Sequence, residues 1–175
     1  MDAWAAIDSI RVVRDFAATP IEPDKLDRIL NAGRRAGSSK NLQRWSFIVV
    51  RDRDRLERLA SVGHFAQPLA RAAVAVALVT PDPRAPDAPL SIVFDIGRAA
   101  QNMVLAAWDL GIGSVPATVY DHALARELLG YPDDHHCEYL LSFGYPADPS
   151  LLSAPKQRGG RAPLDDIVHD ERWTE

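Results

Sequence analysis

The sequence predicts a single α+β domain over residues 1–175, in which helices flank a mixed β-sheet. Residues 72–80 are apolar almost throughout, which is typical of a strand covered on both faces. Residues 91–110 have the period of a helix, with an apolar stripe too wide for a surface position. Strand-like and helical segments follow one another without an internal repeat, and a chain of this length can bury a core of its own.

The first half of the chain contains further elements with clear boundaries. A helix is expected over 24–35, because Pro23 is favoured at the first helical position. A buried strand is expected at 45–50 and a short helix at 54–60. The first of these helices carries one apolar stripe, made of Leu26, Ile29, Leu30 and Gly33.

The helix over 91–110 is expected to be the central helix of the domain. One of its faces carries Ile92, Ile96, Ala99, Met103 and Ala107. Small residues beside that face allow another backbone to approach closely, so we expect the helix to contribute to a dimer interface. The preceding residues 81–89 contain four prolines and predict an exposed loop.

The last third of the chain ends in a segment of different composition. Asp121 is expected to cap a short helix that stops before Gly130. A strand is expected at 139–144. From Pro146 the chain is rich in proline, glycine and arginine, which predicts an extended C-terminal arm over about 146–175.

Composition and charge exclude several classes of function. Twenty basic and 24 acidic residues leave a formal net charge of −4, which argues against general nucleic-acid binding. No apolar run approaches the roughly 20 residues needed to span a bilayer, and the N-terminus lacks the basic region of a signal peptide. The single cysteine, Cys137, fits a reducing compartment. We therefore expect a cytoplasmic protein without a nucleic-acid or membrane partner.

A polar loop at residues 36–45 is the strongest candidate for ligand binding. It combines a glycine, two hydroxyls, carboxamides and an indole, and an apolar strand follows it directly. Because Asn41 and Gln43 can each donate and accept hydrogen bonds, they suit a planar ring with both kinds of edge.

Two pairs of arginines lie near the ends of the chain. Arg11 and Arg14 are three residues apart, as are Arg158 and Arg161. If the two ends meet, the planar guanidinium groups form a cationic site suited to a phosphate. The alternative is a set of solvated surface arginines, which is the usual position of long basic side chains.

The run His135-His136-Cys137-Glu138 offers ligand atoms for a metal. Consecutive residues of a strand point to opposite faces, and no second cluster has suitable spacing. The sequence therefore predicts no metal site. It also lacks the Gly-x-Ser-x-Gly motif of a hydrolase.

Several segments, spread over most of the chain, resemble the FMN-dependent nitroreductase family. Ile10-Arg11-Val12-Val13-Arg14-Asp15-Phe16 looks like the family's opening Arg-Arg-Ser-x-Arg-x-Phe element. Residues 36–45 look like its Ala-Pro-Ser-x-x-Asn-x-Gln-Pro-Trp loop. Residues 95–113 are similar to its long central helix, and residues 144–146 with 161–168 look like its closing segment.

The resemblance implies a nitroreductase-like α+β fold, an intertwined homodimer with extended arms, and two FMN molecules, each bound at the subunit interface. Arg11 and Arg14 would meet the phosphate and ribityl chain, with Val12 between them, and Arg161 beside Gly160 would close on the same phosphate. The residues expected from the partner subunit are Ser38, Ser39 and Asn41. The segment that presents backbone amides to the flavin contains Pro116, Ala117 and Thr118.

The implied activity is an oxidoreductase in which FMN accepts a hydride from NADH or NADPH. The reduced flavin would then act on a small electrophilic acceptor, such as a nitroaromatic or a quinone, in a ping-pong cycle. This scheme requires no catalytic side-chain acid or base. An alternative is a non-catalytic flavin-binding member, because Ile10 and Val12 stand where the family commonly has Arg and Ser. A third possibility is another reduction on the same fold, such as dehalogenation or ring saturation.

Overall fold

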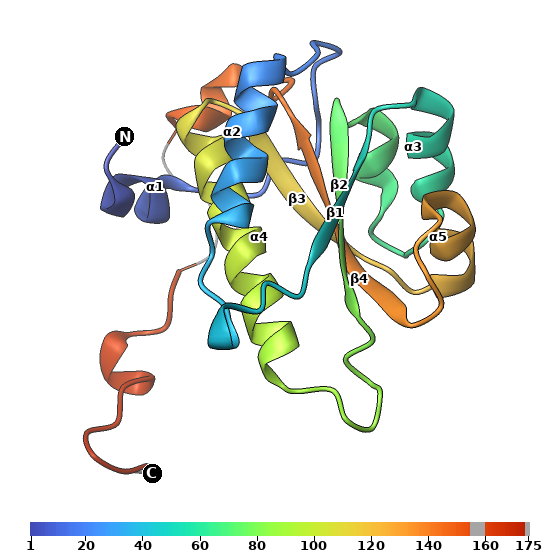
Figure 1. The fold of residues 1–175 in the computed structure, drawn as a ribbon. Coiled ribbons are helices and arrows are strands. Elements are labelled where there is room, and N and C mark those ends of the chain that lie inside the picture. Colours follow the sequence, from blue (N-terminus) through green and yellow to red (C-terminus); the bar gives the residue numbers. More distant parts are fainter. Residues whose placement is uncertain (155–159, 174–175) are drawn as a thin grey trace.

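The structure is a computed structural model that describes residues 1–154 and 160–173, and an antiparallel sheet forms its centre (Figure 1). The strand order is β1-β2-β4-β3. The strands are β1 (Ser46–Val50), β2 (Val74–Pro81), β3 (Gly113–Thr118) and β4 (His135–Gly144). The sheet was expected to be mixed. All three strand pairs are antiparallel, and parallel pairing in the described residues occurs only at the isolated bridge between Val12 and Ser114.

Helices cover both faces of the sheet (Figure 1). The α-helices are α1 (Ala3–Ser9), α2 (Pro23–Arg34), α3 (Arg53–Leu59), α4 (Ser91–Asp109) and α5 (His122–Leu129). Short 3₁₀ helices lie at Ser39–Asn41, Gln67–Arg71, Pro149–Leu152 and Leu164–Asp166. Within the described ranges, no helix is long and apolar enough to cross a membrane.

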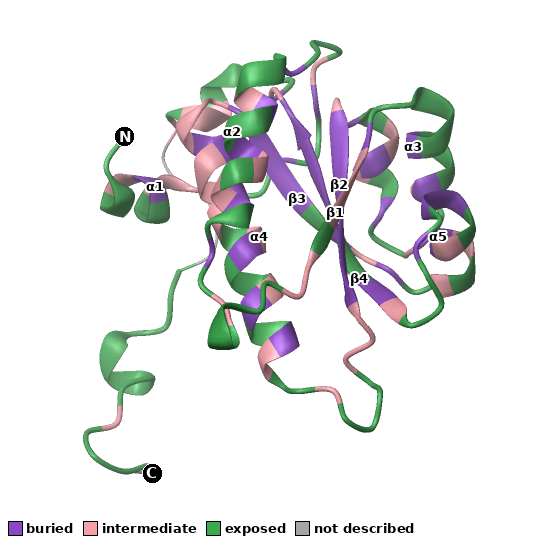
Figure 2. Ribbon diagram, in the orientation of Figure 1, coloured by how far each residue is buried: buried purple, intermediate pink, exposed green. Residues whose placement is uncertain are grey.

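The two faces of β2 supply two separate hydrophobic cores. Val76 and Leu78 pack with α2 and α4, whereas Ala75 and Ala77 pack with α3 and α5. This alternation follows from the period of two along a strand. The prediction that this strand is covered on both faces is therefore confirmed, as the continuous burial of β2 in Figure 2 shows.

The long, strongly periodic segments agree with the predictions. Helices α2, α3, α4 and α5 begin and end within two residues of the expected bounds. Asp121 accepts a hydrogen bond from the Leu124 amide as the cap of α5, and Gly130 ends the helix with a φ of 70°. The stripe of α4 is buried at Ile92, Ala99, Met103 and Ala107.

The predictions are wrong or incomplete at the edges of the sheet. Residues 45–50 were expected to be a buried strand, but β1 is an edge strand in which only Val50 is fully buried. Neither α1 nor β3 was expected. Strand β3 was missed because it contains Gly113 and Pro116, and both residue types are unfavourable in strands. Strand β4 begins at the polar residue His135, four residues before the expected start at 139.

After β4 the chain leaves the sheet. The side chain of Leu152 packs against the small core around Trp108. Residues 160–173 carry no buried residue and extend away from the sheet in Figures 1 and 2. That these residues form an arm around a second subunit stays a prediction.

The N-terminal segment lies unusually close to the start of β3 and the end of β4. The Val13 amide donates a 3.0 Å hydrogen bond to the Ser114 carbonyl. A Cβ atom on Gly113 would lie 2.5 Å from Val13 Cβ, and one on Gly144 would lie 2.8 Å from the Phe16 ring. Glycine at both positions therefore lets residues 11–16 lie flat against the sheet.

We expect Gly113→Ala to destabilise the protein by about 1–3 kcal/mol, because the added methyl group meets a β-branched side chain that cannot rotate away. Gly97→Ala is the matched control, since a Cβ there has nothing within 4 Å. Urea unfolding monitored by tryptophan fluorescence measures the difference. Equal stability of the two variants would contradict the close packing.

A polar triad ties α2 to the end of β4. Tyr145 Oη donates a 2.5 Å hydrogen bond to Glu22, and Lys25 donates to both side chains. The hydrogen bond from Tyr145 is the main reason why the pKa of Glu22 is lowered from 4.5 to about 2. Because the folded-state pKa is depressed, this contribution to stability is present above pH 4.5 and is lost as the pH falls towards 2.

We expect Tyr145→Phe to be less stable than the unmodified chain at neutral pH. The difference in the free energy of unfolding between the two proteins should become smaller as the pH falls from 4.5 towards 2. Urea unfolding of both proteins across the range tests this. A gap that is independent of pH would show that the hydroxyl does not act through the Glu22 carboxylate.

Candidate functional site

The outer edge of β3 is only partly covered. At one end the Val13 amide binds the Ser114 carbonyl. At the other end Gly63 lies so close to the Thr118 carbonyl that a Cβ would come within 2.2 Å of the oxygen. Between these contacts Pro116 is exposed. The Val119 amide donates to the Glu138 carbonyl on β4. Because backbone groups alternate in direction along a strand, the Thr118 amide points away from β4 towards this edge.

Two arginines flank the covered end of that edge. Val12 forms the bridge to Ser114, is 46% exposed, and separates Arg11 from Arg14. Arg14 is exposed, whereas Arg11 is half-buried and donates to the Ala154 carbonyl. Arg11 Nε is buried and has no hydrogen-bond partner in the described residues. A buried donor without a partner is unusual and marks a place where a ligand could accept.

The predicted contribution of the C-terminal arginines stays a prediction. Gly160 and Arg161 are exposed and belong to the segment 160–173, which extends away from the sheet in Figure 1. Arg158, the other member of the predicted pair, lies outside the described residues.

The polar loop has a strained backbone that its own side chains hold in place. Lys40, Asn41 and Gln43 have φ values of 52°, 55° and 47°, in the left-handed region that non-glycine residues seldom adopt. Ser38 Oγ accepts from the Gln43 amide at 3.0 Å, and the Ser39 amide donates to Asp95 at 2.9 Å. Strain of this kind is concentrated at functional sites.

Within one chain the loop and the arginines lie at opposite ends of α4. The loop is anchored at Asp95, in the first half of the helix, whereas Arg11 lies 5.9 Å from the Trp108 ring in the last turn. The rise of 1.5 Å per residue places these two positions about 20 Å apart. The two groups of predicted site residues therefore do not meet in a single chain.

A cavity of about 390 Å³ lies between α4 and the sheet, and Pro116 of β3 forms part of its wall. Most of its surface is apolar. The side chains that line it from α4 belong to Val93, Ile96 and Ala100, and the sheet contributes Leu78, Thr80, His136, Glu138, Tyr139 and Leu141. The cavity therefore adjoins the open edge of β3. Of the predicted segment 116–118, Ala117 instead faces the core on the other side of the sheet.

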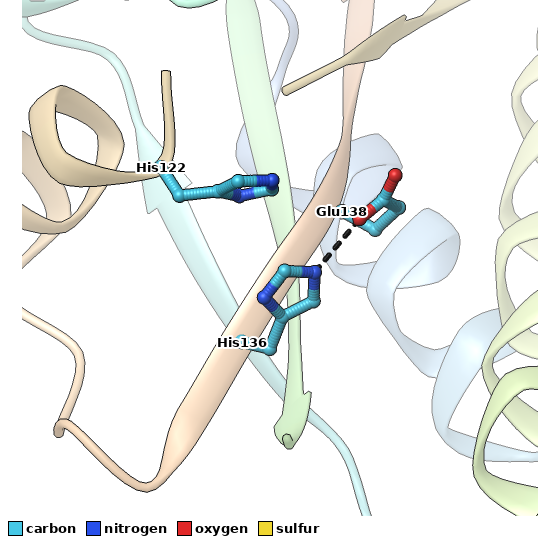
Figure 3. A group of neighbouring side chains, drawn as sticks. All are labelled: His122, His136 and Glu138. Atoms are coloured by element: carbon cyan, nitrogen blue, oxygen red, sulfur yellow. Dashed lines mark hydrogen bonds and ion pairs between the residues drawn. The ribbon is translucent and has the colours of Figure 1, made fainter. Parts of the chain in front are cut away.

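Three possible metal ligands lie close together beside this cavity, and two of them line it (Figure 3). They are His122, His136 and Glu138. The sequence predicted that consecutive residues of this strand point to opposite faces. The side chain of Cys137 indeed points away from those of His136 and Glu138, into the core with α3 and α5. Sequence reasoning missed His122, which lies 14 residues before His136 and comes close only through the packing of α5.

Comparison with known proteins agrees with the fold. The model of the nitroreductase family matches residues 7–77 and 61–145. A protein of Archaeoglobus fulgidus, provisionally named NADH dehydrogenase/NAD(P)H nitroreductase, is 35% identical over 168 residues, covering 93% of this chain and 94% of the relative.

Two solved structures show the same architecture. An FMN-dependent nitroreductase from Clostridium difficile has a TM-score of 0.83 at 25% identity, with 97% of this chain and 99% of that chain covered. NADPH:FMN oxidoreductase from Vibrio harveyi, complexed with NAD+, has a TM-score of 0.84 at 27% identity, with 98% of this chain and 78% of that chain covered. These findings confirm the predicted fold and the oxidoreductase class: the chain belongs to the nitroreductase family.

Proposed function

We propose that this chain binds FMN and reduces a small electrophilic acceptor, such as a nitroaromatic or a quinone, at the expense of NADH or NADPH. The observation that carries the proposal is the open edge of β3, with an amide that points outwards and two arginines at one end. The FMN and NADPH in the names of the two structural relatives support the same cofactors. When bound, FMN supplies the hydride chemistry, in a ping-pong cycle.

The arginines fit the phosphate of this cofactor. Arg14 is exposed and Arg11 keeps a buried Nε without a partner, so both have donors to offer a phosphate oxygen. Guanidinium groups bind phosphate through short charge-assisted hydrogen bonds. Arg161, with the neighbouring Gly160, would complete this site by movement of the C-terminal segment.

The edge of β3 fits the ring system. The Thr118 amide would donate a hydrogen bond at the reactive edge of the flavin, and Pro116 would lie beside the ring. The adjoining cavity is mostly apolar and has Pro116 in its wall, which suits a planar aromatic acceptor beside the flavin.

The separation of the two groups along α4 supports a homodimer. Ser38, Ser39 and Asn41 would reach the cofactor from the partner subunit, because their own arginines lie about 20 Å away. Val93 and Phe94 on α4 are 55% and 67% exposed, and Leu90 before the helix is 89% exposed. Such an apolar surface is suited to an interface.

The first test is the visible absorption spectrum of the purified protein with FMN, before and after anaerobic addition of NADPH or NADH. We expect flavin bands that bleach with at least one donor and return when a quinone is added. Retained flavin that neither donor bleaches would rule out the enzymatic proposal.

A non-catalytic flavin-binding protein is the second candidate, and Val12 is the observation that favours it. Val12 is exposed at the bridge to β3 but offers no side-chain hydrogen bond. Ile10 packs against the core around Trp108, so restoring a polar residue there would disturb the fold. If the site is weakened, Val12→Ser should raise FMN affinity roughly tenfold. Unchanged affinity together with turnover by the unmodified protein would exclude this candidate.

We expect Arg14→Ala to weaken FMN binding by roughly ten- to hundredfold, the range for losing one hydrogen bond to a charged group. Arg51→Ala, another exposed arginine, is the control and should bind FMN normally. Titration of FMN fluorescence gives both dissociation constants. Equal affinities would remove Arg14 from the site.

We expect sedimentation at micromolar concentration to give twice the chain mass of 19.2 kDa. Phe94→Glu should produce a monomer that loses FMN, because it places a charge in the proposed interface. Phe65→Glu is the matched control, since Phe65 is 75% exposed on a different part of the surface. A monomeric unmodified protein that still binds FMN would contradict the shared site.

A further inference from the structure

Three side chains with metal-binding atoms converge beside β4. One ligand atom from each of His122, His136 and Glu138 lies within 4.8 Å of the other two (Figure 3). His136 and Glu138 are two residues apart on β4. The pairing of β2 with β4 shifts register between Leu78 and Val79, which leaves Glu138 without a partner on β2. This irregularity has the form of a β-bulge, which can redirect a side chain.

Helix α5 holds the third side chain against the other two. His122 is the first residue of the helix, immediately after the capping residue Asp121. Its ring centre lies 4.6 Å from that of His136, with the planes tilted by 40°. The Tyr131 hydroxyl donates to the His122 carbonyl and so ties the end of α5 to its start. The imidazole is therefore positioned by a capped helix rather than by a loop.

The histidine nitrogens are not fully used by the protein. His136 is 3% exposed, and its Nε2 lies 2.7 Å from Glu138 Oε2. Neither ring nitrogen of His122 has a hydrogen-bond partner among the described residues, and its Nδ1 is also buried. A neutral imidazole always keeps one nitrogen lone pair. Whichever tautomer is present, His122 therefore offers an unused lone pair or an unused donor beside a carboxylate and a second imidazole.

We propose that His122, His136 and Glu138 bind a divalent transition-metal ion of the zinc type, with its fourth position open to the cavity. Two imidazoles and one carboxylate are a ligand set that zinc accepts with a water in the fourth position. His136 and Glu138 both line the 390 Å³ cavity, so the open position faces space that a water or a small ligand can enter. Calcium and magnesium do not fit, because they prefer oxygen ligands.

The geometry requires only a small adjustment. Ligand atoms in a tetrahedral zinc site lie about 3.4 Å apart, as follows from bonds of about 2.1 Å. The separations here reach 4.8 Å at most, and the His136–Glu138 pair is already closer than required. Glu138 has a half-exposed side chain and can move. The metal would displace any proton that this pair shares.

The neighbouring charges are compatible with a cation. Arg84 pairs with Asp82 at 2.9 Å, so the two charges offset each other. Glu138 is then the carboxylate that offsets one of the two charges of the metal. The three ligand residues are not among those assigned to FMN, although the open position of the metal faces the cavity proposed for the acceptor.

The test measures zinc directly. Protein treated with a chelator is titrated with zinc chloride by calorimetry, and the zinc retained after gel filtration is measured by mass spectrometry. Cobalt(II) then replaces zinc, because its visible spectrum reports tetrahedral coordination. The variants are His122→Phe and Glu138→Gln, which keep much of the side-chain volume, and circular dichroism checks that they fold. His135→Ala is the matched control, since His135 contacts Asp134 instead of the cluster.

We expect one zinc ion per chain, a tetrahedral cobalt spectrum, at least a roughly tenfold loss of affinity in both variants, and no loss in the control. Three results would overturn the proposal: no zinc binding, binding that both folded variants retain, or binding that disappears in His135→Ala. None of these readouts depends on flavin or turnover.

Discussion

The pairing of β2 with β4 is the constraint on which the rest of the structure depends. β2 is buried along nearly its whole length and lies between β1 and β4. Its alternate side chains enter two different cores, one with α2 and α4 and the other with α3 and α5. If β2 were displaced by one residue, both cores would receive the wrong set of side chains. The register of this pair therefore determines where helices α2 to α5 pack.

The irregularity in that pairing has consequences for the cavity. His136 and Leu141 are five residues apart on β4 and would point to opposite faces of an uninterrupted strand. Both line the same cavity, because the register shift at Leu78 and Val79 places one extra residue of β4 between them. One local change in a strand thus combines polar and apolar side chains on a single wall. The remaining wall comes from α4, from Pro116 on the neighbouring strand, from β2, and from Pro83 and Arg84 in the loop after β2.

The length of α4 organises the surface in a comparable way. The helix holds the strained loop near Asp95 and the half-buried Arg11 near Trp108. A rigid helix of 19 residues keeps these groups apart, and no side-chain rotation can join them. Near the N-terminal end of the helix, the apolar side chains of Leu90, Val93 and Phe94 are exposed in one chain. Distance and exposure thus support the same proposal, that the cofactor site is shared between two chains.

The sequence by itself determined the α+β class, the family, helices α2 to α5 and the buried strand β2. These elements have long hydrophobic periods or clear caps, such as Asp121 and Gly130, and such signals are local. The ordered motifs also predicted Arg11, Arg14 and Pro116 as site residues, and the fold places the segment that holds the two arginines and Pro116 along one edge of the sheet. The contact of Arg161 with those arginines stays a prediction.

Only the tertiary structure decided the edges and the meeting of distant side chains. β3 contains a glycine and a proline, so pairing with β4 rather than its own composition makes it a strand. β1 is apolar enough for a central strand but lies at an edge, because the order of strands is set by packing. His122 reaches His136 and Glu138 because α5 packs beside β4. No spacing of residues along the chain indicates this contact. Periodicity along a chain is a local property, whereas the choice of neighbours depends on how all the faces are buried together.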